Sequence, residues 1–259
     1  MDFLKSLGSR NQSRKTRDWF AIKNLASGEA EVFIYDFIGF DPWFGGVSAQ
    51  DFVRDLRGIT ANKILLRINS PGGDITEAVT IRNALREHPA AIETHVDGLA
   101  ASSASWLGLV AEKVVMSPHS MMMIHEPWNI IAGDSQAMAK EAEILDKFGD
   151  DIASMYVEQA GGEVEEWRDL MREETWYTDQ EAVDAGLADE VAGEASGENR
   201  YDPTILNVFK HTPEHLLKPA KRNRTPKPTP IAAIAAPNEE LLREVARFEH
   251  IQSRLLGVA

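Results

Sequence analysis

The amino-acid sequence predicts a layered α/β fold with a mainly parallel sheet. Segments with strand character alternate along the chain with segments whose apolar residues recur at helical spacing. Glycine or proline separates many of these segments, so each has a length typical of one strand or one helix. Strands that alternate with helices favour parallel strands joined by crossover helices.

The individual elements follow from the local patterns. In the helix over 47–56, for example, Phe52, Val53 and Leu56 share one face. In chain order, the patterns predict a strand region over 18–42 that is clearest at Glu31–Gly39, a helix over 47–56, a strand over 63–68, a helix from Ile75 that ends before Pro89, a strand over 92–96, a turn at Gly98, an apolar helix over 101–111, strands over 113–116 and 121–125, a long amphipathic helix over 134–159, and helices over 163–172 and 179–185.

Charge and composition divide the chain into four parts. The net charge of −14 hides two basic ends, over 1–17 and 216–231, which flank a strongly acidic middle. An acidic globule of this kind excludes broad binding to nucleic acid. We expect a basic flexible arm over 1–17, a globular domain over 18–195, a loop and a disordered Pro/Lys/Arg-rich linker over 196–237, and a C-terminal amphipathic helix over 238–259.

Several kinds of site are excluded by residues that the sequence lacks. Without cysteine, the chain can form no disulfide, thiolate nucleophile or zinc–thiolate site. No two histidines have metal-ligand spacing on one element, and no dinucleotide or Walker motif is present, so we expect no metal and no cofactor. The first residues lack an apolar signal-peptide core, and the longest near-apolar run, 98–111, is too short to span a bilayer.

Three short segments carry candidate catalytic groups. Gly72-Gly73 follows a strand, Ser102 lies at the start of an apolar helix, and His125 closes the next strand. A Gly pair is a common turn and a serine at a helix start is commonly a cap, but together these residues supply an oxyanion donor, a nucleophile and a general base. The amides of Gly73 and Ser103 are the expected oxyanion donors. By composition alone, Ser103 and Ser105 are rival nucleophiles.

These segments together resemble the ClpP-type serine peptidases, and more particularly the phage head-maturation (prohead) proteases. The matching sequences are Asn69-Ser70-Pro71-Gly72-Gly73, Gly98-Leu99-Ala100-Ala101-Ser102, Met123-Ile124-His125-Glu126-Pro127 and the stretch 181–189. The resemblance covers about 18–193 and implies a ClpP/crotonase-like fold of layered βα repeats, with 18–195 as the protease domain. It also implies that Ser102, His125 and an acid form a triad. Glu174 stands where the family has aspartate, and Glu173 and Asp169 are the alternatives.

The resemblance implies a serine endopeptidase that cleaves scaffold and coat-protein segments during phage capsid maturation through an acyl-enzyme. The alternatives are a housekeeping Clp-like proteolytic subunit that works with an ATPase, and a catalytically inactive capsid-assembly factor. The 19–44 segment and the basic Pro-rich tail favour the phage subgroup.

The expected partners and location follow from the same resemblance. We expect a ring homo-oligomer with phage scaffold and major capsid proteins as substrates, and no nucleic-acid or membrane partner. The expected location is the cytoplasm of the bacterial host, inside assembling procapsids. The helix over 134–159 is the expected contact between subunits, through Met138, Ile144, Phe148 and Met155.

Overall fold

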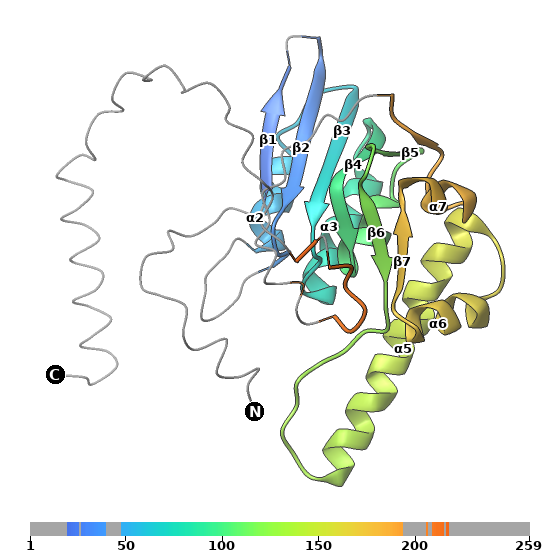
Figure 1. Ribbon diagram of the computed structural model, residues 1–259. Helices are drawn as coiled ribbons and strands as arrows, with labels where there is room; N and C mark the ends of the chain where they lie inside the picture. Colours follow the sequence, from blue (N-terminus) through green and yellow to red (C-terminus); the bar gives the residue numbers. More distant parts are fainter. Residues whose placement is uncertain are drawn as a thin grey trace, which may run out of the picture. The chain divides into compact units, whose positions relative to one another are not determined.

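The computed structural model describes residues 20–25, 27–39, 48–193, 206, 209–214 and 216–217 (Figure 1). The expected basic arm, most of the loop and linker, and the expected helix over 238–259 lie outside these residues. The expected α/β class with a mainly parallel sheet is confirmed.

The described elements agree closely in order with the sequence patterns. They are β1 (Phe20–Asn24), β2 (Glu29–Tyr35), α2 (Ala49–Leu56), β3 (Lys63–Ser70), α3 (Ile75–Glu87), β4 (Ala91–Ala101), α4 (Ser103–Gly108), β5 (Lys113–Met116), β6 (Met121–Ile124), α5 (Ser135–Ala160), α6 (Val164–Arg172), β7 (Thr175–Thr178), α7 (Asp179–Asp184) and β8 (Glu190–Val191).

The strands of the described part form one sheet that divides at β4. Its main path runs β1-β2-β3-β4-β5-β8, and all pairs along it are parallel except β1–β2. The first half of β4 pairs with β5, whereas its last three residues, Leu99 to Ala101, pair with β6. β6 in turn pairs with β7 in antiparallel fashion. The carboxyl ends of β3, β4 and β6 therefore lie close together at one edge of the sheet (Figure 1).

The turn expected at Gly98 is wrong, because Gly98 lies inside β4. The register between β3 and β4 shifts there: Ile68 is opposite Val96, but Ser70 is opposite Ala100. This irregularity lets β4 bulge and continue toward β6. Glycine suits the position because a Cβ there would lie 2.9 Å from Oδ1 of the buried Asn69.

Two further expectations differ from the structure. The helix expected over 101–111 is shorter, because β4 extends to Ala101 and α4 covers only 103–108. The strand β7 was not expected, although Thr175-Trp176-Tyr177-Thr178 has the β-branched and aromatic composition of a strand. The two-residue strand β8 was also not expected, and it is too short to show a pattern of its own.

The two faces of the sheet are covered by different apolar clusters. Successive strand residues point to opposite faces, so Ala100, Met122 and Ile124 join the main core with helix residues such as Phe52 and Trp106. The opposite face carries a smaller cluster of buried Leu99, Ala101, Met121, Met123 and Leu206. Trp176, Phe209, Leu216 and Leu217 pack against this second cluster. Leu206, Phe209, Leu216 and Leu217 therefore contribute to the folded domain beside the carboxyl end of β4.

The long helix α5 has two distinct halves. Ile152, Ala153, Met155 and Tyr156 in its second half are buried in the core of the same chain. In its first half, the side chains of Met138 and Ile144 are exposed, and Figure 1 shows this half extending beyond the sheet. None of the helices in the described ranges is both apolar and long enough to cross a bilayer.

The close approach at Gly98 predicts a specific loss of stability. We expect Gly98→Ala to lower the free energy of unfolding by about 1–3 kcal/mol, because the added methyl group must displace buried Asn69 or distort the bulge. Gly193→Ala is the matched control, since a Cβ at Gly193 meets no atom within 4 Å. Urea denaturation measures both, and equal midpoints for the two variants would contradict the prediction.

Candidate active site

Ser102 occupies a sharp turn between β4 and α4. Its backbone has φ 54° and ψ −129°, a conformation that costs a non-glycine residue free energy and is found at functional turns. A strand–serine–helix turn of this kind presents the hydroxyl group away from the sheet. The Ser102 amide donates to the Met123 carbonyl over 2.9 Å, so β6 helps to hold the turn.

The geometry distinguishes Ser102 from its two rivals. Ser103 and Ser105 are both buried. The Ser105 hydroxyl donates to the Ser102 carbonyl over 2.6 Å and lies 2.7 Å from the Tyr156 hydroxyl. The Ser103 hydroxyl is directed at the Gly73 carbonyl, 3.4 Å away. Only the Ser102 hydroxyl, among these three in the described structure, meets a histidine.

His125 follows the last residue of β6 and faces Ser102. Its Nε2 atom lies 2.7 Å from the Ser102 Oγ atom, a hydrogen-bond distance suited to proton transfer. Burial lowers the pKa of His125 to about 4, while the charge of Glu174 and a backbone hydrogen bond at Glu126 act in the opposite direction. The imidazole is therefore neutral at pH 7, the state in which it can accept the serine proton.

Glu174 lies in the turn between α6 and β7, with a left-handed backbone at φ 53°. Its side chain is buried, and its charge acts on His125. Its carboxylate accepts hydrogen bonds from the main-chain amides of Lys210 and His211, at 2.7 and 2.6 Å, and from Trp176 Nε1 at 3.3 Å. Among the described residues, His125 is hydrogen-bonded to Ser102, and no hydrogen bond links His125 with Glu174.

The alternative acids point elsewhere. Asp169 pairs with Arg172 on the solvent side of α6, where the Asp169 side chain is 71% exposed. Glu173 is also exposed. Of the three candidate acids, Glu174 is the buried one and the one whose charge acts on His125.

The Gly72-Gly73 turn packs directly against Ser102. At Gly72, with φ +90°, a Cβ would lie 2.6 Å from the Ser102 Cβ atom and from the Ala101 carbonyl oxygen. Gly73 lies against the backbone of Ile38, which accepts from the Asp74 amide and donates to the Gly72 carbonyl. Among the described residues, neither the Gly73 amide nor the Ser103 amide donates a backbone hydrogen bond.

An ion cluster that sequence analysis missed holds the chain next to His125. The guanidinium of Arg168, on α6, binds Glu126 at 2.8 Å and Asp150 of α5 at 2.6 Å, and it donates to the Asp146 carbonyl at 2.9 Å. Arg168 is only 5% exposed. In the sequence, Arg168 lies on the same face of α6 as Trp167 and Met171. This position could have indicated that the Arg168 side chain is buried.

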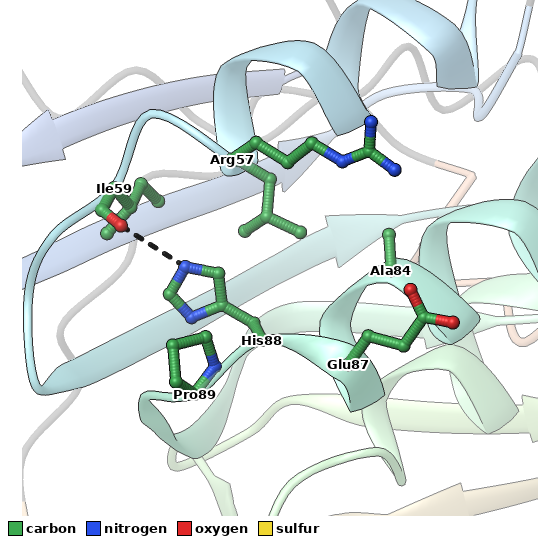
Figure 2. A pocket seen from close by; sticks show the side chains of 7 residues that line it. Arg57, Ile59, Ala84, Glu87, His88 and Pro89 are labelled. Atoms are coloured by element: carbon green, nitrogen blue, oxygen red, sulfur yellow. Dashed lines mark hydrogen bonds between the residues drawn. The ribbon is translucent and has the colours of Figure 1, made fainter.

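A pocket of about 240 Å³ lies between α2 and α3 (Figure 2). His88, Arg57 and Glu87 line it, and His88 Nε2 is 3.3 Å from the Ile59 carbonyl. α2 leads into β3, and α3 leads into β4. The carboxyl ends of these two helices therefore lie near the amino ends of β3 and β4. The pocket is therefore at the opposite edge of the sheet from Ser102.

Comparison with known proteins identifies the family of the chain. The family model described as Clp protease matches residues 48–195, more than half of the chain. The chain belongs to the Clp protease family. Ser102, His125 and Glu174 all lie inside the matched region.

Individual relatives give the same result. Proteolytic subunit 2 of the ATP-dependent Clp protease of Corynebacterium glutamicum is 33% identical over 153 residues, which cover 58% of this chain and 72% of that protein. Proteolytic subunit 1 from Protochlamydia amoebophila is 33% identical over 152 residues, 56% of this chain and 74% of the relative. A proteolytic subunit from Pleurastrum terricola is 28% identical over 137 residues, 52% and 69% of the two chains.

The environment of His125 predicts how the reactivity of Ser102 depends on pH. Because the pKa of His125 is lowered to about 4, we expect labelling of Ser102 by a fluorophosphonate to keep its rate down to about pH 5 and to fall as the imidazole becomes protonated near pH 4. Labelling rates between pH 4 and 8, with circular dichroism to confirm folding at each pH, measure this. Half-loss of the rate near pH 6.5, the value of an unburied histidine, would contradict it.

Proposed function

We propose that the chain is a serine endopeptidase that cleaves peptide bonds through an acyl-enzyme at Ser102. The observation that carries this proposal is the 2.7 Å contact between Ser102 Oγ and His125 Nε2, made by a serine in a strained strand-to-helix turn. Membership in the Clp protease family supports it independently.

The proposed reaction uses five groups. Ser102 Oγ attacks the scissile carbonyl carbon while His125 Nε2 accepts its proton, and the amides of Gly73 and Ser103 stabilise the oxyanion. The resulting imidazolium then donates the proton to the leaving amine, so that the peptide C–N bond breaks. A water molecule, deprotonated by His125, then attacks the acyl carbon of the ester. The acyl C–Oγ bond breaks, His125 returns the proton to Ser102 Oγ, and the second product leaves as a carboxylic acid. The Glu174 carboxylate stabilises the imidazolium in both steps.

The relatives are named as proteolytic subunits of an ATP-dependent protease. This favours a proteolytic subunit that works with an ATP-dependent partner over the capsid-maturation role. Capsid maturation remains a second candidate because of one observation: the basic ends and the Pro-rich linker lie outside the region matched to the family. Basic segments of this kind suit acidic protein surfaces. An ATPase gene or capsid genes beside the coding sequence would distinguish the two roles.

The assembly we propose is a closed ring of identical subunits. Exposed apolar side chains support an interface at the first half of α5 and the loop before it, where Asn129 donates to Glu141 of α5 over 2.7 Å. The exposed residues are Trp128, Ile130, Ile131, Met138 and Ile144. Met155, expected at this contact, instead belongs to the core of its own subunit.

Replacement of the nucleophile tests the activity itself. We expect Ser102→Ala to abolish cleavage of unfolded protein substrates such as casein, with a loss on the order of 10⁶ in kcat, while the protein stays folded. Ser103→Ala is the matched control, because the Ser103 hydroxyl does not contact His125, and it should retain most of the activity. Full activity of purified Ser102→Ala would exclude the proposed mechanism and the catalytic role of Ser102.

The interface proposal makes a separate prediction. In sedimentation velocity at micromolar concentration, we expect the chain to form a discrete oligomer that Met138→Asp dissociates, because a carboxylate would be desolvated in an apolar contact. Glu143→Asp, a conservative change at an exposed position of the same helix, should leave the oligomer intact. A parent chain that sediments as an active monomer would contradict the ring.

A further inference from the structure

The chain continues past the matched family region and returns to the catalytic side chains. We call Leu206, 209–214 and 216–217 the carboxy-terminal segment; Figure 1 draws it in orange near the carboxyl ends of β3 and β4. Leu206 is fully buried and packs with Leu99 and Met123. The family model ends at 195, so the segment is an addition to the part of the chain that the model matches.

The segment supplies two of the hydrogen-bond donors that hold the candidate acid. The Lys210 amide donates to one carboxylate oxygen of Glu174, and the His211 amide donates to the other. These are short bonds, at 2.7 and 2.6 Å, as expected where an amide meets an ionised carboxylate. His211 is fixed in turn, because its Nδ1 atom lies 3.0 Å from the Glu173 carbonyl.

The segment also contacts the candidate base. The ring of Phe209 meets the ring of His125 edge to face, with 5.2 Å between centroids, and it packs on Trp176 at 6.2 Å. Trp176 Nε1 is a third donor to Glu174. One segment therefore touches His125 through Phe209 and Glu174 through the next two amides.

We infer that the carboxy-terminal segment is a structural part of the catalytic centre, and that the main-chain amides of Lys210 and His211 position the Glu174 carboxylate for its work on His125. The inference rests on the proposed function. Glutamate has one more rotatable bond than aspartate, so its carboxylate needs more restraint to stay in one place. Two amides that bind separate oxygens fix both its position and the plane of the carboxylate.

Main-chain donors can be removed one at a time with proline, which has no amide hydrogen. We would compare Lys210→Pro and His211→Pro with Lys210→Ala and His211→Ala, which remove the same side chains but keep the donors. A second comparison uses two shortened chains: one ends at Leu217 and keeps the segment, and the other ends at Pro203 and lacks it. Circular dichroism confirms that each variant is folded.

The kinetic readout is fluorophosphonate labelling at Ser102, resolved into the maximal rate and the half-saturating concentration. We expect the proline variants and the chain ending at Pro203 to lower the maximal rate by about 10- to 100-fold, the range typical when a supporting hydrogen-bond partner is lost. The half-saturating concentration should change little. Each alanine variant keeps the amide donor and should therefore label clearly faster than the proline variant at the same position. The chain ending at Leu217 should label within about twofold of the parent.

Glu174→Gln shows whether the effect passes through the acid. In the parent it should slow labelling strongly, on the order of 10³–10⁴, whereas in the chain ending at Pro203 the same substitution should cost much less. If Glu174→Gln slows labelling by the same factor in both chains, the inference is overturned. Labelling as fast without the segment as with it would also overturn it, and faster labelling would show that the segment blocks the site rather than supports it.

A measurement that does not depend on catalysis, the pKa of His125, tests this inference separately from the proposed function. In the parent chain, Glu174→Gln should lower the pKa of His125, followed by NMR of its ring, because the substitution removes a charge that raises that pKa. The shift should shrink in the chain ending at Pro203. An equal shift in both chains contradicts the inference even if Ser102 proves unreactive. If Ser102 is not labelled but the pKa of His125 shifts as expected in both chains, only the proposed function is contradicted.

Discussion

The pairing of the end of β4 with β6 is the constraint on which the candidate site depends. β4 pairs first with β5 and then, beyond the bulge at Gly98, with β6. This exchange of partners brings the carboxyl end of β6 beside the turn at Ser102, so that the Ser102 amide binds the Met123 carbonyl and His125 Nε2 comes within 2.7 Å of Ser102 Oγ. If β4 ended at Gly98, no ladder would fix the distance between serine and histidine.

The same region concentrates several costly features that its surroundings offset. Ser102 and Glu174 both have left-handed backbones, which non-glycine residues rarely adopt. The Glu174 side chain is buried, where a charge is costly unless it is paired or hydrogen-bonded, and His125 is partly buried. The Gly72 turn lies against Ser102, Arg168 binds Glu126 next to His125, and the two amides of the carboxy-terminal segment bind Glu174. Strain and burial that are supported in this way are typical of functional sites.

Sequence patterns predicted most of this fold because the helices and buried strands have clear apolar periodicity. They placed Ser102, His125 and Glu174 close together only through the family resemblance, since residues 72 positions apart carry no pairing signal of their own. The bulge at Gly98 depends on the partner strand and could not be seen in the local pattern. The donors from Lys210 and His211 are backbone groups, which every residue except proline carries, so composition could not distinguish them. A partial signal was present in Leu206 and Phe209, two large apolar residues in a polar stretch that was assigned to loop and linker.

The central claim is that Ser102 is the nucleophile of a Clp-family peptidase, selected over Ser103 and Ser105 by its turn and by His125. The most direct test is to treat the full chain with a fluorophosphonate and to identify the modified residue by peptide mass spectrometry. The account predicts stoichiometric modification of Ser102 alone, abolished by denaturation and strongly slowed by His125→Ala. Modification of Ser103 or Ser105, or no modification of the folded protein, would contradict it.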